Sequence, residues 1–250
     1  MTAPPSPAAA VRHFQVSGTR LGRKLLTMRA NWYRFWWAVY SNAPDSSKRT
    51  MDVVGACVAL CLFAPLGCLI AVIIKLDGGP VLFRQTRVGY RGRLFDMYKF
   101  RSMRVDAEKM LDKLRAQNEK GQGITFKMKN DPRVTWIGRY IRKRSLDEFP
   151  QFWNVLVGDM SLVGPRPSLP SEAKLYKLED RRRFESKPGI TCLWQVGERN
   201  GGALEFGDRN EIDFKEQVSL DVRYIENRSF LKDIWLVCKT VVVMIRGTGA

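Results

Sequence analysis

The chain has 250 residues, a formal net charge of +17 and a single histidine, His13. The length allows one or two domains with a real core, and the charge favours a polyanionic partner: nucleic acid, an anionic membrane surface or a phosphorylated substrate. The single histidine argues against Ser-His-Asp, Cys-His and other histidine-based catalysis. The five cysteines lack C-x-x-C spacing and are odd in number. They therefore argue against a zinc site and a disulfide framework, and fit a reducing cytoplasm.

The N-terminal segment is basic and aromatic. Residues 1–44 contain no Asp or Glu, and residues 31–40 place aromatic side chains beside Arg34. This composition is typical of a segment that lies on a membrane surface. A disordered start followed by a buried aromatic patch is an equal alternative, and a transit peptide a less favoured one. We assign residues 1–47 to a membrane-surface segment.

An uncharged apolar run follows from Val53 to Ile74, with Pro65 near its middle. A straight helix of this length would measure about 33 Å at ~1.5 Å per residue, enough to cross a hydrocarbon core of ~30 Å. Proline removes a helical hydrogen bond and clashes with the preceding turn. A helix bent at Pro65 would instead have arms of roughly 18 and 14 Å, the depth of one leaflet.

Basic residues flank this run on both sides: Lys48 and Arg49 precede it, and Lys75 and Arg84 are among those that follow. Basic flanks tend to stay in the cytoplasm. A spanning helix would place one flank on the wrong side, whereas a hairpin bent at Pro65 keeps both on the same side. We therefore predict that residues 48–76 form a re-entrant membrane helix in a monotopic protein.

The remaining residues, 77–250, are predicted to form one cytoplasmic domain. A turn signal at 78–80 precedes alternating residues that predict a β-hairpin over 81–100. Residues 190–196 are strand-like. Amphipathic spacing predicts helices at 106–118 and 134–144. A strongly charged helix is expected at 172–184, and two closing helices at 214–226 and 231–245, the last of them rather apolar. The predicted fold class is α/β, helix-rich with a small sheet.

Asp147-Glu148 is the leading chemical candidate. The pair follows the basic residues 142–144 and precedes a proline, Pro150. Ser145 and Glu148 match a capping box, but that register places Pro150 where a helical hydrogen bond is needed. With Asp147 as N-cap the proline falls in the first turn, and Asp147 lies at a position that binds anions. Spacing alone favours a purely structural N-cap.

Other candidates are cationic or acidic. Arg166 lies between two prolines, which stiffen the backbone around a guanidinium able to bind phosphate in bidentate fashion. Lys99 and Arg101 are predicted to point to one face of a strand, as a cationic site. Asp159 and Asp221 could bind metal or hydrogen-bond a substrate. A surface loop, a solvated face and helix caps are the respective structural alternatives.

Four segments together resemble the bacterial sugar transferase family, the monotopic polyprenol-phosphate phosphoglycosyl transferases. They are LFDMYKFRSM at 94–103, DPRVTWIGRYIRKRSLDEFPQFWNVLVGDMSLVGPRP at 131–167, KPGITCLWQV at 187–196 and LDVRYIENRSFLKDI at 220–234. The resemblance implies a small α/β domain on the cytoplasmic face of the bacterial inner membrane, anchored by a re-entrant helix. It implies transfer of a sugar-1-phosphate from a UDP-sugar to undecaprenyl phosphate, with release of UMP.

The resemblance also implies roles for individual residues. Asp147 matches the nucleophile that forms a phosphosugar-enzyme intermediate, and Glu148 would place Mg²⁺ or assist proton transfer, so the two carboxylates are the expected metal ligands. Arg166 matches a loop that binds the nucleotide phosphates. The expected substrate-binding positions are Lys99, Arg101, Arg144, Arg166, Asp159 and Asp221. This chemistry needs no histidine, because a carboxylate is the nucleophile and cations offset its repulsion from the diphosphate.

Two departures from the family pattern are Cys192, where the family usually has Gly, and Ala64, where it often has Ser before the proline. The expected partners are the UDP-sugar, undecaprenyl phosphate and anionic lipids, and no nucleic acid. The competing hypotheses are a non-catalytic membrane scaffold for glycan assembly and a membrane protein that binds nucleic acid. The sequence leaves open the sugar, the glycan pathway and whether the protein forms a homo-oligomer.

Overall fold

The computed structural model describes residues 27–28, 30–32, 46–107, 109–110, 131–199, 202–203 and 212–246. Most of the aromatic segment at 31–40 and most of the expected helix at 106–118 lie outside these residues. The described part is an α/β arrangement, rich in helices, with three small two-stranded sheets. This confirms the predicted fold class, although the strands are divided among three sheets instead of forming one.

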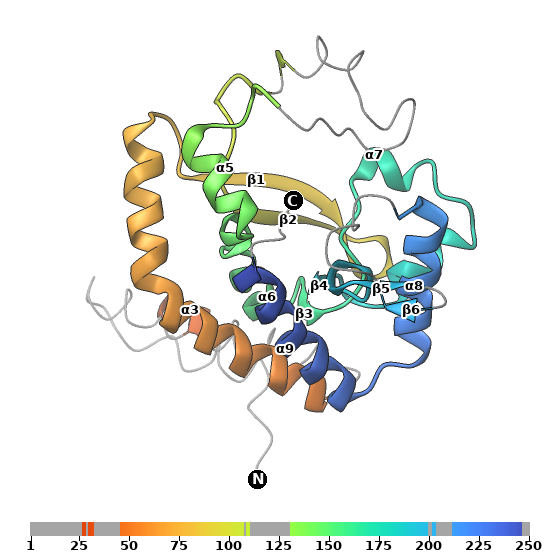
Figure 1. Ribbon diagram of the computed structural model, residues 1–250. Helices are drawn as coiled ribbons and strands as arrows, with labels where there is room; N and C mark the ends of the chain where they lie inside the picture. Colours follow the sequence, from red (N-terminus) through yellow and green to blue (C-terminus); the bar gives the residue numbers. More distant parts are fainter. Residues whose placement is uncertain are drawn as a thin grey trace.

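The apolar run belongs to one long helix, α3 (Ser46–Leu76), which contains Pro65. Figure 1 shows α3 changing direction between an arm that begins at its N-terminal end and an upright arm that ends beside the hairpin. The two arms do not fold back on each other, so the expected hairpin takes the form of one bent helix. A proline inside a helix removes one hydrogen bond and commonly bends the helix without ending it.

Most of α3 faces away from the domain. By length and composition this helix could cross a membrane. Only 17% of its most apolar 18-residue stretch is buried against the rest of the protein. Its exposed large apolar side chains include Val54, Val58, Leu62, Leu69, Val72 and Leu76. So large an apolar surface is unfavourable in water and marks a membrane or protein contact. Together with the hydropathy, it indicates that the protein associates with a membrane.

The N-terminal end of α3 is fixed to the domain by buried polar groups. The guanidinium of Arg49 donates to the carbonyl oxygens of Val155 and Leu156, each at 2.7 Å. These carbonyls belong to the last turn of helix α6 (Gln151–Val157), where carbonyl groups lack the usual i+4 helical donor; Val155 also accepts from the Gly158 amide at 3.1 Å. Asp52 accepts hydrogen bonds from the Ser161 hydroxyl and the Leu162 amide, both at 2.9 Å.

Lys48 extends this polar anchor to the C-terminal helices. Its ammonium lies 2.7 Å from a carboxylate oxygen of Asp233, and also donates to the Tyr224 hydroxyl and the Val163 carbonyl. Tyr224 belongs to α8 (Phe214–Glu226) and Asp233 to α9 (Phe230–Arg246). The sequence predicts both helices to within a residue. One end of α3 is thereby tied to three other helices.

The predicted hairpin is confirmed. Strands β1 (Leu82–Val88) and β2 (Leu94–Phe100) pair antiparallel, and a 3₁₀ turn at Tyr90–Gly92 joins them. The side chain of Asn154 in α6 accepts from the Tyr98 amide at 3.1 Å and donates to the Asp96 carbonyl at 2.8 Å. The hairpin is therefore held in a fixed position against α6.

Helix α5 (Trp136–Lys143) packs between α3 and the hairpin, as Figure 1 shows. The Thr135 hydroxyl caps it by accepting from the Gly138 amide at 3.0 Å. Its apolar side joins a small core of Ile70, Ile74, Phe100, Ile137 and Ile141. The larger core lies among α6, α8 and α9 and the base of α3.

Two further small sheets, each of two short strands, complete the described strands. Strands β3 (Ser161–Val163) and β4 (Gly189–Thr191) pair parallel, and β5 (Glu198–Arg199) and β6 (Gly202–Ala203) pair antiparallel. The strand expected over 190–196 ends early, because residues 194–196 form a 3₁₀ turn that closes at Gly197, where φ is 91°.

The prediction of one helix over residues 172–184 is wrong. This stretch contains α7 (Pro170–Ala173), an irregular link and a 3₁₀ segment at Asp180–Glu185. Leu175 and Leu178 are 67% and 85% exposed, so the apolar positions form no buried stripe to stabilise a long helix. Arg183 is instead buried against Asp221 in α8.

Candidate functional site

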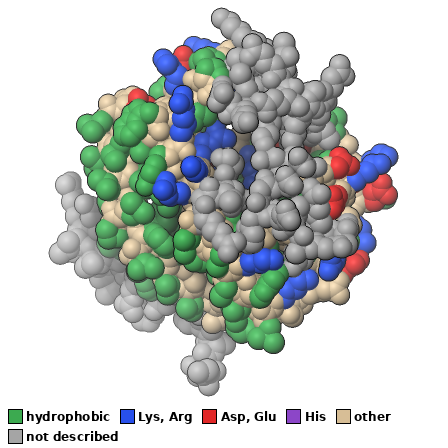
Figure 2. Space-filling model, viewed as in Figure 1, with side chains coloured by type: hydrophobic (Ala, Val, Ile, Leu, Met, Phe, Trp, Pro, Cys, Tyr) green, Lys and Arg blue, Asp and Glu red, His purple; other side chains and the backbone are tan. Residues whose placement is uncertain are grey.

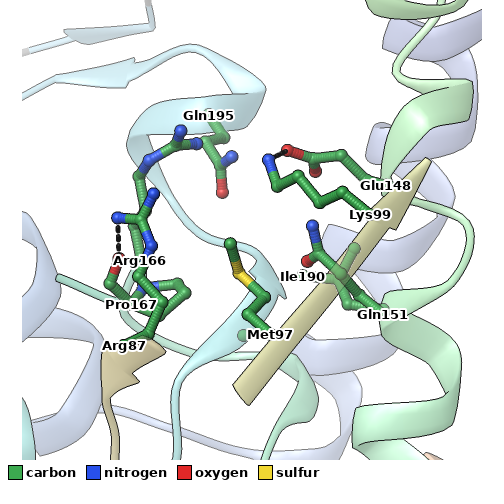
Figure 3. Close-up of a pocket in the computed structure, with 10 residues that line it drawn as sticks. Arg87, Met97, Lys99, Glu148, Gln151, Arg166, Pro167, Ile190 and Gln195 are labelled. Atoms are coloured by element: carbon green, nitrogen blue, oxygen red, sulfur yellow. Dashed lines mark hydrogen bonds and ion pairs between the residues drawn. The ribbon is translucent and has the colours of Figure 1, made fainter. Parts of the chain in front are cut away.

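A pocket lies where the β1–β2 hairpin, the turn before α6 and the loops beside β3 and β4 meet (Figure 3). Its lining is mostly polar and cationic. The lining residues are Arg87, Met97, Lys99, Glu148, Gln151, Arg166, Pro167, Gly189, Ile190 and Gln195. Figure 3 shows Lys99 and Glu148 on one side and the side chains of Arg87 and Arg166 on the opposite side. Four separate segments of chain thus contribute charged groups to one cavity.

The Asp147-Glu148 pair lies on a short 3₁₀ turn, Leu146–Glu148, between α5 and α6. Ser145 begins the turn in a left-handed conformation with φ 55°, and Pro150 is the N-cap of α6. The expectation that Asp147 caps α6 is therefore wrong: the chain reverses through a separate turn first. As a result Glu148 lines the pocket, whereas Asp147, the preceding residue of the turn, is not among the lining residues and has 8% of its surface exposed.

An aromatic cluster between α3 and β2 supports this turn. The ring of Phe149 stacks on Phe100 of β2 with centroids 6.2 Å apart, and meets Phe63 of α3 edge-on at 6.3 Å. A Cβ on Gly67 would lie 3.0 Å from a carbon of the Phe149 ring. Glycine at this position therefore lets the helix backbone approach the residue that follows Glu148.

Lys99 and Glu148 form an ion pair on one side of the pocket, with 2.8 Å between Nζ and Oε1. Burial opposes ionisation of Glu148, but attraction to Lys99 and Arg166 outweighs it and holds the Glu148 pKa below its ordinary value. Asp147 differs. Burial raises the pKa of Asp147 to about 6, against an opposing attraction to Lys99 and with added repulsion from Glu148. Adjacent carboxylates thus have pKa values shifted in opposite directions, a frequent property of catalytic pairs.

Arg166 projects from a rigid loop. Pro165 and Pro167 are buried on either side of it, whereas Arg166 itself is exposed. Its guanidinium carbon lies 5.9 Å from the centre of the Trp194 ring. The loop approaches the chain before β4 so closely that a Cβ on Gly164 would lie 2.3 Å from the Lys187 carbonyl oxygen. The backbone is therefore fixed and the cation is presented to the pocket.

Arg87 and Gln195 also line the pocket, although the sequence analysis treated neither as a site residue. Arg87 counted there only as one more basic residue after the apolar run. The available signal was its place in the hairpin: alternation puts it on the face of Gln85, and the pairing register places it opposite Phe95. Gln195 carried no signal, because its position depends on the unexpected turn at 194–196.

Two expected cationic residues lie elsewhere. Arg101 is buried, and its guanidinium donates to the Ile74 carbonyl and the Asp77 carboxylate at the end of α3, at 3.2 and 3.3 Å. Arg144 is exposed and lies over the Tyr140 ring, 4.3 Å from its centre. Neither lines the pocket, so Lys99 and Arg101 do not form the shared cationic site that strand alternation suggested.

The two expected acidic residues are also outside the pocket lining. Asp159 follows the end of α6 and is exposed. Asp221 is 1% exposed and forms an ion pair with Arg183, whose other nitrogen donates to the Tyr176 hydroxyl at 3.3 Å. Burial raises the pKa of Asp221 to about 6, although Arg183 opposes the shift. This network supports the fold behind the pocket.

The residues present can be tested for a fit to Mg²⁺. Magnesium is usually held by one or two carboxylates together with substrate phosphates and waters. Asp147 and Glu148 supply two adjacent carboxylates beside the pocket. Over the described ranges, no three His, Cys, Asp or Glu side chains gather as a cation site. The donor set therefore fits a magnesium ion that arrives with a phosphorylated substrate, and does not fit a cage built from protein ligands alone.

The fold and pocket together define a membrane-associated protein with a pocket lined by Lys99, Arg87 and Arg166 next to the Asp147-Glu148 turn. The sequence profile of the bacterial sugar transferase family matches residues 43–247. The chain therefore belongs to the bacterial sugar transferase family, as its resemblance implied.

Relatives with curated names agree with this assignment. The chain is 47% identical to the galactosyl transferase CpsE of Streptococcus agalactiae serotype III over 204 residues, and 41% identical to the undecaprenyl-phosphate galactose phosphotransferase of Salmonella typhimurium over 210 residues. These matches cover 82% and 81% of this chain but only 43% and 41% of the relatives. It is also 37% identical to the exopolysaccharide production protein ExoY of Rhizobium meliloti over 208 residues, which covers 82% of this chain and 88% of ExoY.

Proposed function

We propose that this protein transfers a sugar-1-phosphate from a UDP-sugar to undecaprenyl phosphate and releases UMP, as the first membrane step of surface glycan synthesis. Family membership and the names of the relatives support this proposal. The observation that carries it is the pocket itself: Glu148 and Lys99 face two guanidinium groups across one cavity (Figure 3), and Asp147 is the residue next to Glu148 in the same turn. A pocket of this charge pattern suits a diphosphate that is attacked by a carboxylate.

In the first step, an oxygen of the Asp147 carboxylate attacks the phosphorus that bears the sugar. The bond from that phosphorus to the bridging oxygen breaks, and UMP leaves with the bond's electron pair. Asp147 is covalently joined to the sugar phosphate as an acyl phosphate. Burial of Asp147 lowers its solvation, and the cations of the pocket offset repulsion between the carboxylate and the diphosphate.

In the second step, a phosphate oxygen of undecaprenyl phosphate attacks the same phosphorus and displaces the Asp147 carboxylate. The product is an undecaprenyl diphosphate sugar, and the free enzyme is restored. Lys99 and Arg166 neutralise phosphate charge in both steps. Mg²⁺ bound by Asp147 and Glu148 would add charge neutralisation at the diphosphate.

The membrane helix gives this reaction its location. We place residues 1–47 on the membrane surface, residues 48–76 in a re-entrant helix bent at Pro65, and residues 77–250 in a catalytic domain on the cytoplasmic face of the bacterial inner membrane. Phe63 and Phe149 link the bend region of α3 to the dyad turn. The dyad would then lie where a soluble nucleotide sugar and a lipid phosphate can both reach it. Anionic lipids would attract exposed Lys and Arg side chains, several of which are visible in Figure 2.

The activity test compares purified wild type with the Asp147→Asn variant. Each is supplied with undecaprenyl phosphate, Mg²⁺ and a panel of UDP-sugars, and UMP release is measured. Wild type should release UMP with at least one sugar, and the variant should lose at least ~10³-fold in rate, because an amide is a poor nucleophile. Mass spectrometry should find a phosphosugar on Asp147. Equal turnover in both proteins would refute the nucleophile, and no turnover in wild type would favour the scaffold hypothesis.

The topology has its own test. Tags or single cysteines placed before Lys48 and after Lys75 should both react from the cytoplasmic side. If the two positions are labelled from opposite sides, α3 spans the membrane and the re-entrant arrangement is wrong.

A further inference from the structure

Arg87 is held in the pocket by three hydrogen bonds to neutral oxygens. Its Nε and Nη2 donate to the Gln85 side-chain oxygen at 3.1 and 2.6 Å, and its Nη1 donates to the Pro167 carbonyl at 3.1 Å. A guanidinium has five N–H donors, so one N–H remains on each Nη atom. The planar guanidinium group of Arg87, its donor fork, is therefore oriented by the protein and still has N–H donors available for a ligand.

Arg87 and Arg166 lie next to each other on the same side of the pocket (Figure 3). We call these two side chains the guanidinium pair. Among the described residues, no carboxylate oxygen lies within 4.0 Å of either guanidinium, the distance that defines an ion pair. Glu148 and Glu172 attract Arg87 from farther away. Burial, together with repulsion from Arg166, lowers the pKa of Arg87 to about 10. Two adjacent cations without a bound anion repel each other, so the arrangement favours an anionic ligand.

The side of the pocket that each group occupies decides which phosphate it meets. Glu148 lies opposite the guanidinium pair in Figure 3, and Asp147 precedes it in the same 3₁₀ turn. In phosphoryl transfer the attacking and leaving oxygens lie roughly in line on opposite sides of the phosphorus. An attack from the carboxylate side therefore directs the leaving phosphate towards the guanidinium pair.

We infer that Arg87 is a phosphate-binding residue that acts with Arg166 on the nucleotide phosphate leaving as UMP, and that Gln85 is the positioning residue that orients it. This inference rests on the proposed function and deepens it. Bidentate guanidinium–phosphate contacts are directional and charge-assisted, and charge on the leaving phosphate grows as the bridging bond breaks. Arg87 thus contributes both to binding of UMP and to the first chemical step.

The test measures binding of UMP and of uridine to the full-length protein in detergent, by calorimetry. The ratio of the two affinities isolates the contribution of the phosphate. Arg87→Gln should reduce the preference for UMP over uridine roughly 10- to 100-fold, the effect of losing charged hydrogen bonds. Arg84→Gln is the matched control: Arg84 is on the same strand, its side chain is 65% exposed, and it should leave the ratio unchanged.

Gln85→Leu provides a second, milder test. This variant keeps the charge of Arg87 but removes the oxygen that orients its fork, so the UMP preference should fall several-fold. In an Arg87→Gln background the same change should have no further effect, because there is no fork left to orient.

The inference is overturned if Arg87→Gln leaves the UMP:uridine ratio unchanged, including the case in which both affinities fall equally through a structural defect. It is also overturned if wild type binds UMP no better than uridine. Failure of the proposed function would look different: UMP would still bind with its Arg87-dependent preference, but no UDP-sugar would be turned over.

Discussion

The base of α3 and the pocket both contain several basic side chains. The cations at the base have partners within the protein, whereas those in the pocket remain available to a ligand. At the base, Arg49 donates to two carbonyls and Lys48 meets the Asp233 carboxylate, so the protein itself satisfies each cation. In the pocket, Arg87 and Arg166 lie side by side, and over the described ranges neither forms an ion pair with a carboxylate. Basic residues of the same types therefore have a structural role at the base of α3 and a proposed ligand-binding role in the pocket.

The difference teaches how to separate structural from functional charge in a chain of net charge +17. A buried cation that only supports the fold needs partners within the protein, because desolvation without compensation is costly. A cation that binds substrate keeps part of its hydrogen-bonding capacity for the ligand. Changes at the base should thus lower stability, whereas changes at the pocket should lower activity.

Arg166→Gln should give the largest effect on activity. The variant removes one cation of the guanidinium pair, and loss of one preorganised charge contact typically reduces turnover about 10²- to 10³-fold. Stability should not fall, because the change also removes repulsion with Arg87. The assay is UMP release alongside thermal unfolding, with Arg182→Gln as the control, since Arg182 forms an exposed ion pair with Glu226. A large loss of stability in Arg166→Gln would contradict the distinction.

Arg49→Gln should give the converse result. The variant removes the Arg49 donor from the carbonyls of Val155 and Leu156; the Val155 carbonyl keeps the Gly158 amide, but the loss at Leu156 should cost about 1–3 kcal/mol if that buried group is left unsatisfied. The thermal midpoint should fall, while the activity of the molecules that remain folded stays close to wild type. Lys75→Gln, at the exposed far end of α3, should change neither quantity. Loss of activity without loss of stability in Arg49→Gln would show that the base has a catalytic role.

The sequence predicted the elements whose signal is local. The hairpin follows from alternation, and α5, α8 and α9 follow from local helical patterns. Asp147, Glu148, Lys99 and Arg166 follow from the family resemblance. Arg87 and Gln195 could not be found in this way, because their place in the pocket depends on packing between segments far apart in the chain. Arg101 was misplaced for the same reason: the end of α3 offers it a carbonyl and a carboxylate that no local pattern reveals.

The carboxylates of the pocket predict a pH dependence that the base should not share. Burial raises the pKa of Asp147 to about 6, so kcat/KM should fall about tenfold per pH unit below that value as the nucleophile is protonated. The folded state binds this proton more tightly than the unfolded chain, whose Asp pKa is near 3.8. Protonation of Asp147 should therefore stabilise the fold between about pH 6 and 4.

The measurement is a pH–rate profile of UMP release, with thermal unfolding recorded at each pH. Activity should decline from about pH 6 while the protein stays folded. A profile that is flat between pH 7 and 5 would mean that Asp147 is ionised throughout, and that its burial does not control its chemistry.

The smallest expected effect tests whether α3 positions the dyad as well as anchoring the domain. A Cβ on Gly67 would lie 3.0 Å from one carbon of the Phe149 ring and 3.4 Å from another, so Gly67→Ala should displace Phe149 by a few tenths of an ångström. The added helix propensity, about 1 kcal/mol, offsets a similar cost of overpacking, and stability should change little. Because Phe149 follows Glu148 directly, UMP release should fall by a factor of about three.

Gly55→Ala is the matched control on the same helix. Its new Cβ would lie 2.6 Å from the Cδ1 of Leu162, the end of a flexible side chain near the base of α3. It therefore receives the same gain in helix propensity and a comparable steric conflict, but at a distance from the dyad turn. If both variants reduce activity equally, α3 affects the site only through the general stability of the fold. If Gly67→Ala alone does so, the contact between α3 and Phe149 sets the position of the dyad, because the two variants differ chiefly in the side chain they displace.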